Sequence, residues 1–181
     1  MRILTPSVEF ASPRHALAPR PATLNGKVVA FTDAFGSPQP DGSVKKSAMM
    51  MELKKLLEER FHLAGTLWFI KSNVLDPLSP EVLREIEARA DAVINGECWG
   101  SETVAGVRDA VTLEKLGKPT ITLGYESVRL FFVSIATAEG MPDLPFFGER
   151  QPLVGNVPDQ VEAIAIAGIE DVVRSLTSLK I

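Results

Sequence analysis

The chain has 181 residues, of which 45% are hydrophobic and 23% charged, as is typical of a soluble globular protein. Its 19 basic and 23 acidic residues give a net charge of −4, which argues against binding to nucleic acid. No apolar run approaches the roughly 18 to 20 residues that span a bilayer, so we expect no membrane partner. The single cysteine, Cys98, excludes an intrachain disulfide, and the two histidines lack partners at ligand spacing. We therefore expect a cytoplasmic protein with no metal and no cofactor.

Residues 1–25 form a proline-rich segment that is predicted to be extended, because proline fixes φ and lacks an amide donor. This N-terminal arm either lies along its own domain or crosses onto a second subunit. The second alternative makes the protein a homo- or hetero-oligomer. Residues 26–181 are predicted to form a single α/β domain.

The elements of that domain alternate along the chain. Continuous apolar runs predict strands, and apolar residues at helical spacing predict helices. Ser79 and Pro80 supply an N-cap and a first helical residue, and Gly117 marks a helix end. The predicted strands are 27–32, 66–71, 91–96, 120–123 and a short one near 153–154. The predicted helices are 47–63, 80–90, 101–116, 127–138 and 161–179.

This alternation predicts βαβ units and hence a mostly parallel sheet of four to five strands. The fold class is therefore α/β, a three-layer αβα sandwich of the flavodoxin-like or Rossmann-like type. In such folds the ligand site lies beyond the carboxyl ends of the strands. The candidate substrate-binding residues at those ends are Asp33, Lys71, Gly96, Trp99, Gly100, Ser101, Tyr125 and Glu126.

Cys98 lies between two glycines, after a predicted strand and before a predicted helix. A helix N-terminus favours a thiolate, so Cys98 is a candidate nucleophile, with Ser101 as the helix cap. The alternative is a small buried hydrophobic residue. Glu97 and Glu102 oppose a thiolate if they face the sulfur, and either could instead be a general base; Glu102 is our candidate for acid/base catalysis.

Two neighbouring residues, Lys71 and Trp99, have alternative roles of their own. Lys71 either holds an anionic substrate or is a solvated lysine at a strand end. Trp99 is either a pocket wall or a packed aromatic residue. The amides of Gly100 to Glu102 are expected to stabilise developing negative charge.

Several segments resemble the UGSC family, which is related to the substrate-activating selenoprotein subunits of glycine reductase. The resemblance is carried by residues 90–101, which include Asn95-Gly96-Glu97-Cys98-Trp99-Gly100-Ser101. Further segments that resemble the family are 18–21, 24–27, 57–61, Lys71, 108–110, 113–120 and 140–142. The resemblance implies the fold, the position of the site and a nucleophilic chalcogen at Cys98.

The chain also departs from the family motif. Cys98 is followed by Trp99-Gly100-Ser101, and Glu102 stands where the motif has its second thiol. Gln151-Pro152 replaces the His-Pro pair of the late loop. An internal disulfide cycle is thereby excluded within this chain.

Three functional hypotheses follow. The first is an enzyme that uses Cys98 as nucleophile on a small anionic organic substrate, in a reductase-like or a lyase- or hydratase-like reaction. The second is a subunit of a hetero-oligomeric enzyme that shapes a shared site without Cys98 chemistry. The third is a small-molecule binding module.

Overall fold

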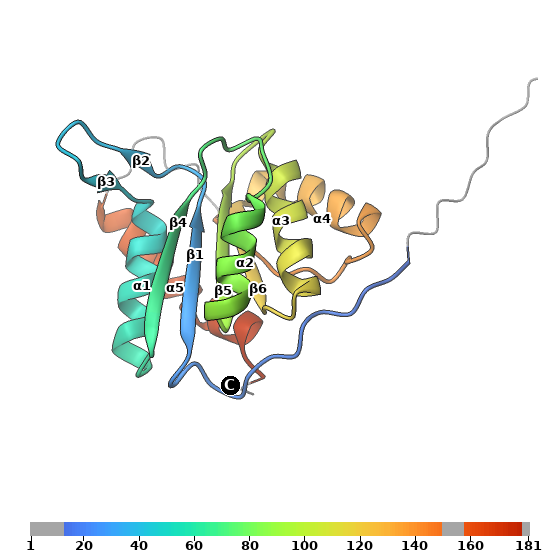
Figure 1. The fold of residues 1–181 in the computed structure, drawn as a ribbon, viewed down its shortest axis with the longest axis horizontal. Coiled ribbons are helices and arrows are strands. Elements are labelled where there is room, and N and C mark those ends of the chain that lie inside the picture. Colours follow the sequence, from blue (N-terminus) through green and yellow to red (C-terminus); the bar gives the residue numbers. More distant parts are fainter. Residues whose placement is uncertain (1–12, 150–157, 179–181) are drawn as a thin grey trace, which may run out of the picture.

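A parallel five-stranded sheet forms the centre of the protein (Figure 1), seen in a computed structural model that describes residues 13–149 and 158–178. The strand order is β4-β1-β5-β6-β7, and every neighbouring pair is parallel. The strands in that order are Gly65–Ile70, Val28–Asp33, Ala92–Cys98, Thr120–Tyr125 and Phe146–Glu149. The sheet confirms the predicted three-layer α/β fold.

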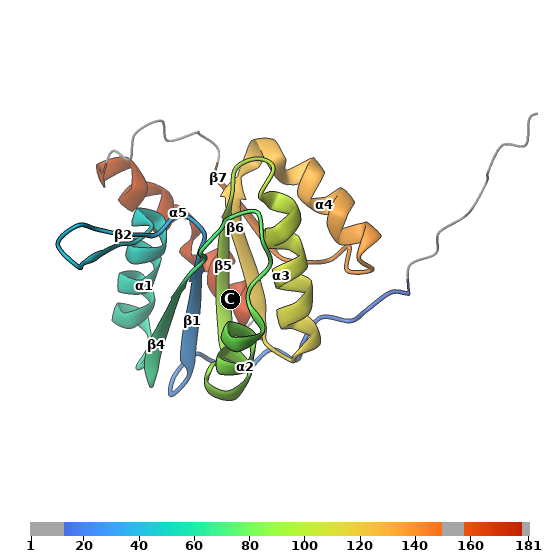
Figure 2. The same ribbon diagram turned by 45° about the horizontal axis from the view of Figure 1, so that its top comes forward.

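Helices cover both faces of the sheet (Figure 2). α1 (Ala48–Arg60) and α5 (Pro158–Leu176) pack together on one face, where Leu53 and Val172 belong to the same buried cluster as Phe31 of β1. The other face carries α2 (Pro80–Arg89), α3 (Thr103–Lys115) and α4 (Arg129–Ala138), which follows the short 3-10 turn η1 (Glu126–Val128). Because the strands are parallel, the carboxyl ends of all five lie at the same edge of the sheet, between the two helical layers.

The predicted starts and ends of the five helices all lie within three residues of the observed ones. Ser79 caps α2 by accepting the Val82 amide, with Pro80 as its first residue, as predicted. Ser47 caps α1 in the same way, but α1 ends at Arg60 because Phe61 has an extended backbone. The sequence pattern also suggests Gly65 as the end of this helix, but Gly65 is the first residue of β4.

Two further differences concern strands. A small hairpin, β2 (Ser37–Pro38) and β3 (Val44–Lys45), occupies the segment between β1 and α1, where no strand was predicted. The strand predicted near 153–154 lies outside the described residues, and β7 is the edge strand of the sheet.

The described part of the N-terminal segment, residues 13–25, lies on its own domain. Arg20 makes two charged hydrogen bonds of 2.7 Å to the buried Glu114 carboxylate and a third, of 3.1 Å, to the Ser175 carbonyl. The Ala18 amide donates to the same carboxylate at 2.6 Å. These contacts tie the segment to α3 and to the end of α5. Oligomerisation through this arm stays a prediction. Within the described ranges, each helix is too short or too polar to cross a bilayer.

Candidate functional site

Cys98 is the last residue of β5 and is 1% exposed. Its sulfur lies against α3, so closely that a Cβ atom on Gly106 would be 2.6 Å from Sγ. Burial raises the pKa of the thiol to about 12, and the negative charge of Glu102 adds to the increase. The expectation of an accessible thiolate is therefore wrong: the sulfur does lie against the first turn of α3, beside Thr103 and Gly106, but it is buried there, and the thiol is neutral at physiological pH.

Lys71 follows β4 and forms a buried ion pair with Asp109 of α3, with Nζ 2.7 Å from Oδ2. The two side chains are 5% and 2% exposed, so Lys71 is not a solvated lysine. Asp109 also accepts the Leu78 amide at 2.7 Å. Burial raises the pKa of Asp109, and the Lys71 charge opposes this increase. The expectation that Lys71 offers an unpaired charge to an anionic substrate therefore fails in this structure, because Asp109 already neutralises that charge.

Glu102 folds back over the turn that precedes α3. Its Oε1 accepts the amide of Gly100 at 2.6 Å and also the amide of Trp99. The expectation that Ser101 caps the helix is wrong: Ser101 is exposed, and the N-cap residue is Glu102, which makes no side-chain cap bond. Because Glu102 already occupies the Gly100 amide, that amide is not free to stabilise substrate charge.

The structure nevertheless brings the predicted nucleophile, base and lysine together. Lys71, Cys98 and Glu102 line one cavity of about 10 Å³, together with Gly96 and Val74. Gly96 has φ +144°, and a Cβ atom there would lie 2.8 Å from the Leu123 carbonyl oxygen, so only glycine fits. The cavity has room for no more than one water molecule.

The remaining predicted residues lie outside this cavity. Asp33 is fully buried and accepts four hydrogen bonds, which fix the loop after β1; the donors are the amides of Phe35, Gly36 and Ser47 and the indole of Trp68. Glu126 forms an ion pair of 2.6 Å with Arg129, away from Cys98.

Trp99 and Tyr125 belong to an aromatic stack that the sequence did not reveal. Trp99 lies parallel to Phe35 with ring centroids 3.9 Å apart, and Tyr125 lies on it at 5.2 Å. Both interpretations of Trp99 therefore hold, since the packed ring also lines a cavity with Phe35 and Tyr125.

The position of Cys98 at a strand end, with residues of the glycine-flanked turn around it, is the arrangement that the UGSC resemblance implies. A model of the UGSC family matches residues 2–178. The chain belongs to the UGSC family. No curated protein and no solved structure matches it.

Sequence reasoning named Glu97 as a possible general base of this UGSC protein but missed its partner Glu149. Glu97 and Glu149, at the ends of β5 and β7, line a second cavity of about 30 Å³ with the aromatic stack and Ser47. Burial raises the pKa of Glu97, and it raises the pKa of Glu149 to about 8, with the Glu97 charge adding to the latter increase. An acidic residue after the apolar run Phe146-Phe147 was a usable signal, but the strand was sought further along the chain.

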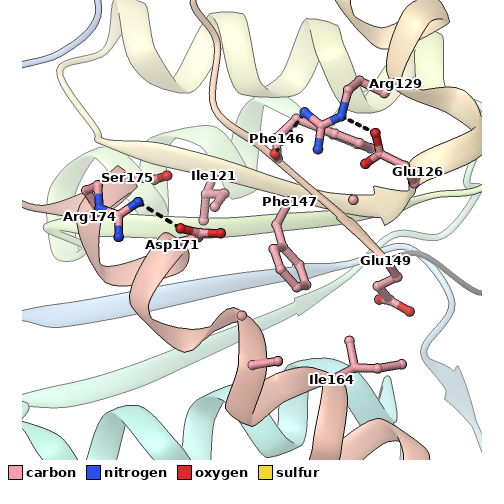
Figure 3. A pocket seen from close by; sticks show the side chains of 13 residues that line it. Ile121, Glu126, Arg129, Phe146, Phe147, Glu149, Ile164, Asp171, Arg174 and Ser175 are labelled. Atoms are coloured by element: carbon pink, nitrogen blue, oxygen red, sulfur yellow. Dashed lines mark hydrogen bonds and ion pairs between the residues drawn. The ribbon is translucent and has the colours of Figure 1, made fainter.

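A cavity of about 720 Å³ in this UGSC protein lies between β7 and α5 (Figure 3). Phe146 and Phe147 form apolar walls, and Glu149 lies at one end. Two ion pairs line the remaining surface, Glu126–Arg129 and Asp171–Arg174. Glu126 is the one predicted site residue that lines this cavity.

Among the described residues, no three His, Cys, Asp or Glu side chains are grouped as metal ligands.

Proposed function

We propose that this UGSC protein is a cysteine-dependent enzyme in which Cys98 adds to a small organic electrophile and Glu102 takes the thiol proton. The supporting observation is the cavity that Lys71, Cys98 and Glu102 share at the carboxyl edge of the sheet. A nucleophile and a base around one space are the minimal requirement for such catalysis.

The thiol must lose its proton during the reaction, because it is neutral at rest. The Lys71 charge favours the thiolate. The Thr103 hydroxyl does so too, because it lies where it can donate a hydrogen bond to the sulfur. Its buried Oγ1 has no other hydrogen-bond partner among the described residues, so Thr103 can donate to the sulfur anion that forms beside it.

The reaction that fits a single thiol is addition to an activated double bond, followed by displacement of the sulfur by water. As the S–C bond forms, the S–H proton passes to Glu102, the π-electron pair of the substrate moves to the neighbouring atom, and Glu102 returns the proton to that atom. Water then attacks the carbon that carries the sulfur; as the C–O bond forms, the S–C bond breaks and one water proton passes to the sulfur, which regenerates the Cys98 thiol and releases the hydrated product. No oxidant or reductant is consumed, so the lyase- or hydratase-like version of the hypothesis is favoured over the reductase-like one.

The charge around Cys98 favours a neutral substrate over the anionic one first expected. Lys71 and Asp109 cancel, and Glu102 leaves the site negative. A substrate carbon also needs more room than about 10 Å³. Val74, in the segment between β4 and α2, lines the cavity and would have to move aside.

Whole-protein mass spectrometry with acrylamide, a small neutral electrophile, tests the proposal, and acrylate is its anionic counterpart. We expect an acrylamide adduct on native Cys98 at neutral pH, none on Cys98→Ser, and slower reaction with acrylate. Loss of the base in Glu102→Gln should slow adduct formation by about 100-fold, while the surface variant Glu58→Gln reacts normally.

Two outcomes would contradict the proposal. If Glu102 acts only through its charge, Glu102→Gln lowers the pKa of the thiol and speeds the reaction. If the native chain stays unmodified while the urea-unfolded chain reacts, Cys98 is a structural residue.

The hypothesis of a subunit in a larger enzyme is supported by a different observation. α4 exposes apolar side chains to solvent: Leu130 is 83% exposed, Phe131 45% and Val133 39%. An apolar patch of this kind is typical of an interaction surface, here for a sister subunit that would complete the small Cys98 cavity. Native mass spectrometry of the complex isolated from cells tests this second candidate, which a monomer would contradict.

A further inference from the structure

The cavity of about 30 Å³ between the ends of β5 and β7 has an unusual lining. Two carboxyl groups face it, from Glu97 and Glu149, and the Ser47 hydroxyl lies beside them. The stacked rings of Phe35, Trp99 and Tyr125 also line it. Its volume matches one water molecule or one ion of similar size.

Glu149 has an unmet hydrogen-bonding capacity in this cavity. The residue is 3% exposed, and its Oε1 has no hydrogen-bond partner among the described residues. Glu97, in contrast, accepts a hydrogen bond from the Ser47 hydroxyl. Buried carboxyl oxygens in proteins are nearly always paired, so the Glu149 oxygen indicates a missing partner.

The charge of the cavity is also uncompensated. Its lining contains no lysine, arginine or histidine among the described residues. Asp33 lies close enough to act on Glu97, and four donors hold it. Burial raises the pKa of both Glu97 and Glu149, and the Glu97 charge adds to the increase at Glu149, so an ionised carboxylate is disfavoured in this cavity as long as it lacks a positive partner. The buried, partly aromatic lining also strengthens the attraction between a carboxylate and a cation.

We propose that the cavity between Glu97, Glu149 and Ser47 binds a small monovalent cation, either an alkali ion or an ammonium group. The cation would supply the positive charge that the described lining lacks, and it would be the partner that Glu149 Oε1 lacks. Divalent ions fit less well, because they are bound mainly through groups of charged ligands, and among the described residues no three His, Cys, Asp or Glu side chains form such a group. The site does not depend on Cys98 chemistry.

Thermal unfolding of the full chain tests the proposal, with chloride salts compared at constant ionic strength. Tetramethylammonium is the reference cation, because it is too large for the cavity; potassium, sodium, ammonium and methylammonium are the probes. We expect a saturable increase in Tm of about 5 °C with at least one probe. A response to potassium or sodium identifies an alkali-ion site, and a response to ammonium and methylammonium alone identifies an amine site.

Substitutions of the carboxyl groups test whether the increase in Tm comes from a cation bound in this cavity. Glu149→Gln should abolish the increase in Tm, and Glu97→Gln provides the same test if the first variant does not fold by circular dichroism. Glu58→Gln, an exposed carboxylate on α1, is the matched control and should keep the increase. Equal Tm values in all salts would overturn the proposal, as would an increase that persists in both site variants or one that only magnesium or calcium produces.

Discussion

Glu149 should make the stability of the protein fall as pH rises from about 4.5 to about 8. Its pKa is about 8 in the folded chain, against 4.5 without the fold. Between these values the unfolded chain has released the proton and the folded chain still holds it, so raising the pH favours unfolding. Below this range both states are protonated and the full stability is present; above it both are ionised and the contribution is lost.

The size of the effect follows from the same shift. Each pH unit within the range costs about 1.4 kcal/mol, which sets an upper limit of about 5 kcal/mol for the whole shift. Because Glu149 faces two cavities that water can enter, we expect about 2–4 kcal/mol. Glu149→Gln cannot ionise, so the variant should match the wild type near the acid end and exceed its stability by this amount above the range.

Urea unfolding followed by circular dichroism, from about pH 5 to about pH 9, measures this difference. Tetramethylammonium chloride as the only salt keeps small cations out of the comparison. Glu58→Gln should run parallel to the wild type at every pH, because that carboxylate is exposed. A stability difference between Glu149→Gln and wild type that does not change with pH would refute the reasoning.

Two further predictions concern the packing around the thiol. Gly106→Ala should destabilise the fold by about 1–3 kcal/mol in urea unfolding, because the new methyl group meets Sγ at 2.6 Å. The additional change Cys98→Ala removes the sulfur and should restore stability. Gly65→Ala is the control, because nothing lies within 4 Å of a Cβ atom at that position. Lys71→Met should cost about 3–5 kcal/mol, because Asp109 is left buried without its cation. Adding Asp109→Asn should recover most of that loss, and a double variant as unstable as Lys71→Met would contradict the ion-pair explanation.

The fold could be predicted from the sequence because the spacing of apolar residues and the helix-capping residues are signals that depend only on neighbouring residues. The apolar run in residues 27–32 and the Ser79-Pro80 cap each depend on neighbours in sequence, and both have the predicted structure. The state of Cys98 is set by packing in three dimensions, which the order of residues along the chain does not reveal. Glycine at position 106 lets the sulfur pack against α3, and burial is the main cause of the raised pKa. A strand followed by a glycine-flanked turn indicates where a thiol lies along the chain, and not which way it points.

For the candidate site too, the sequence predicts which residues lie near one another but not the charges and contacts around them. Lys71 and Glu102 do share a cavity with Cys98, because the carboxyl ends of parallel strands meet at one edge. The neutralisation of Lys71 by Asp109 could not be anticipated, since it depends on which face of α3 turns toward the β4–α2 segment.

Glu97 connects the two proposals, because it lines both the cavity of Cys98 and the cavity of Glu149. Negative charge on this shared wall disfavours a thiolate, so a cation bound between Glu97 and Glu149 would lower the cost of ionising the sulfur. The two effects have the same sign: the cation satisfies the acidic pair and eases the proton transfer from Cys98 to Glu102. The two sites would then be linked through charge at one strand end, without any movement of the sheet.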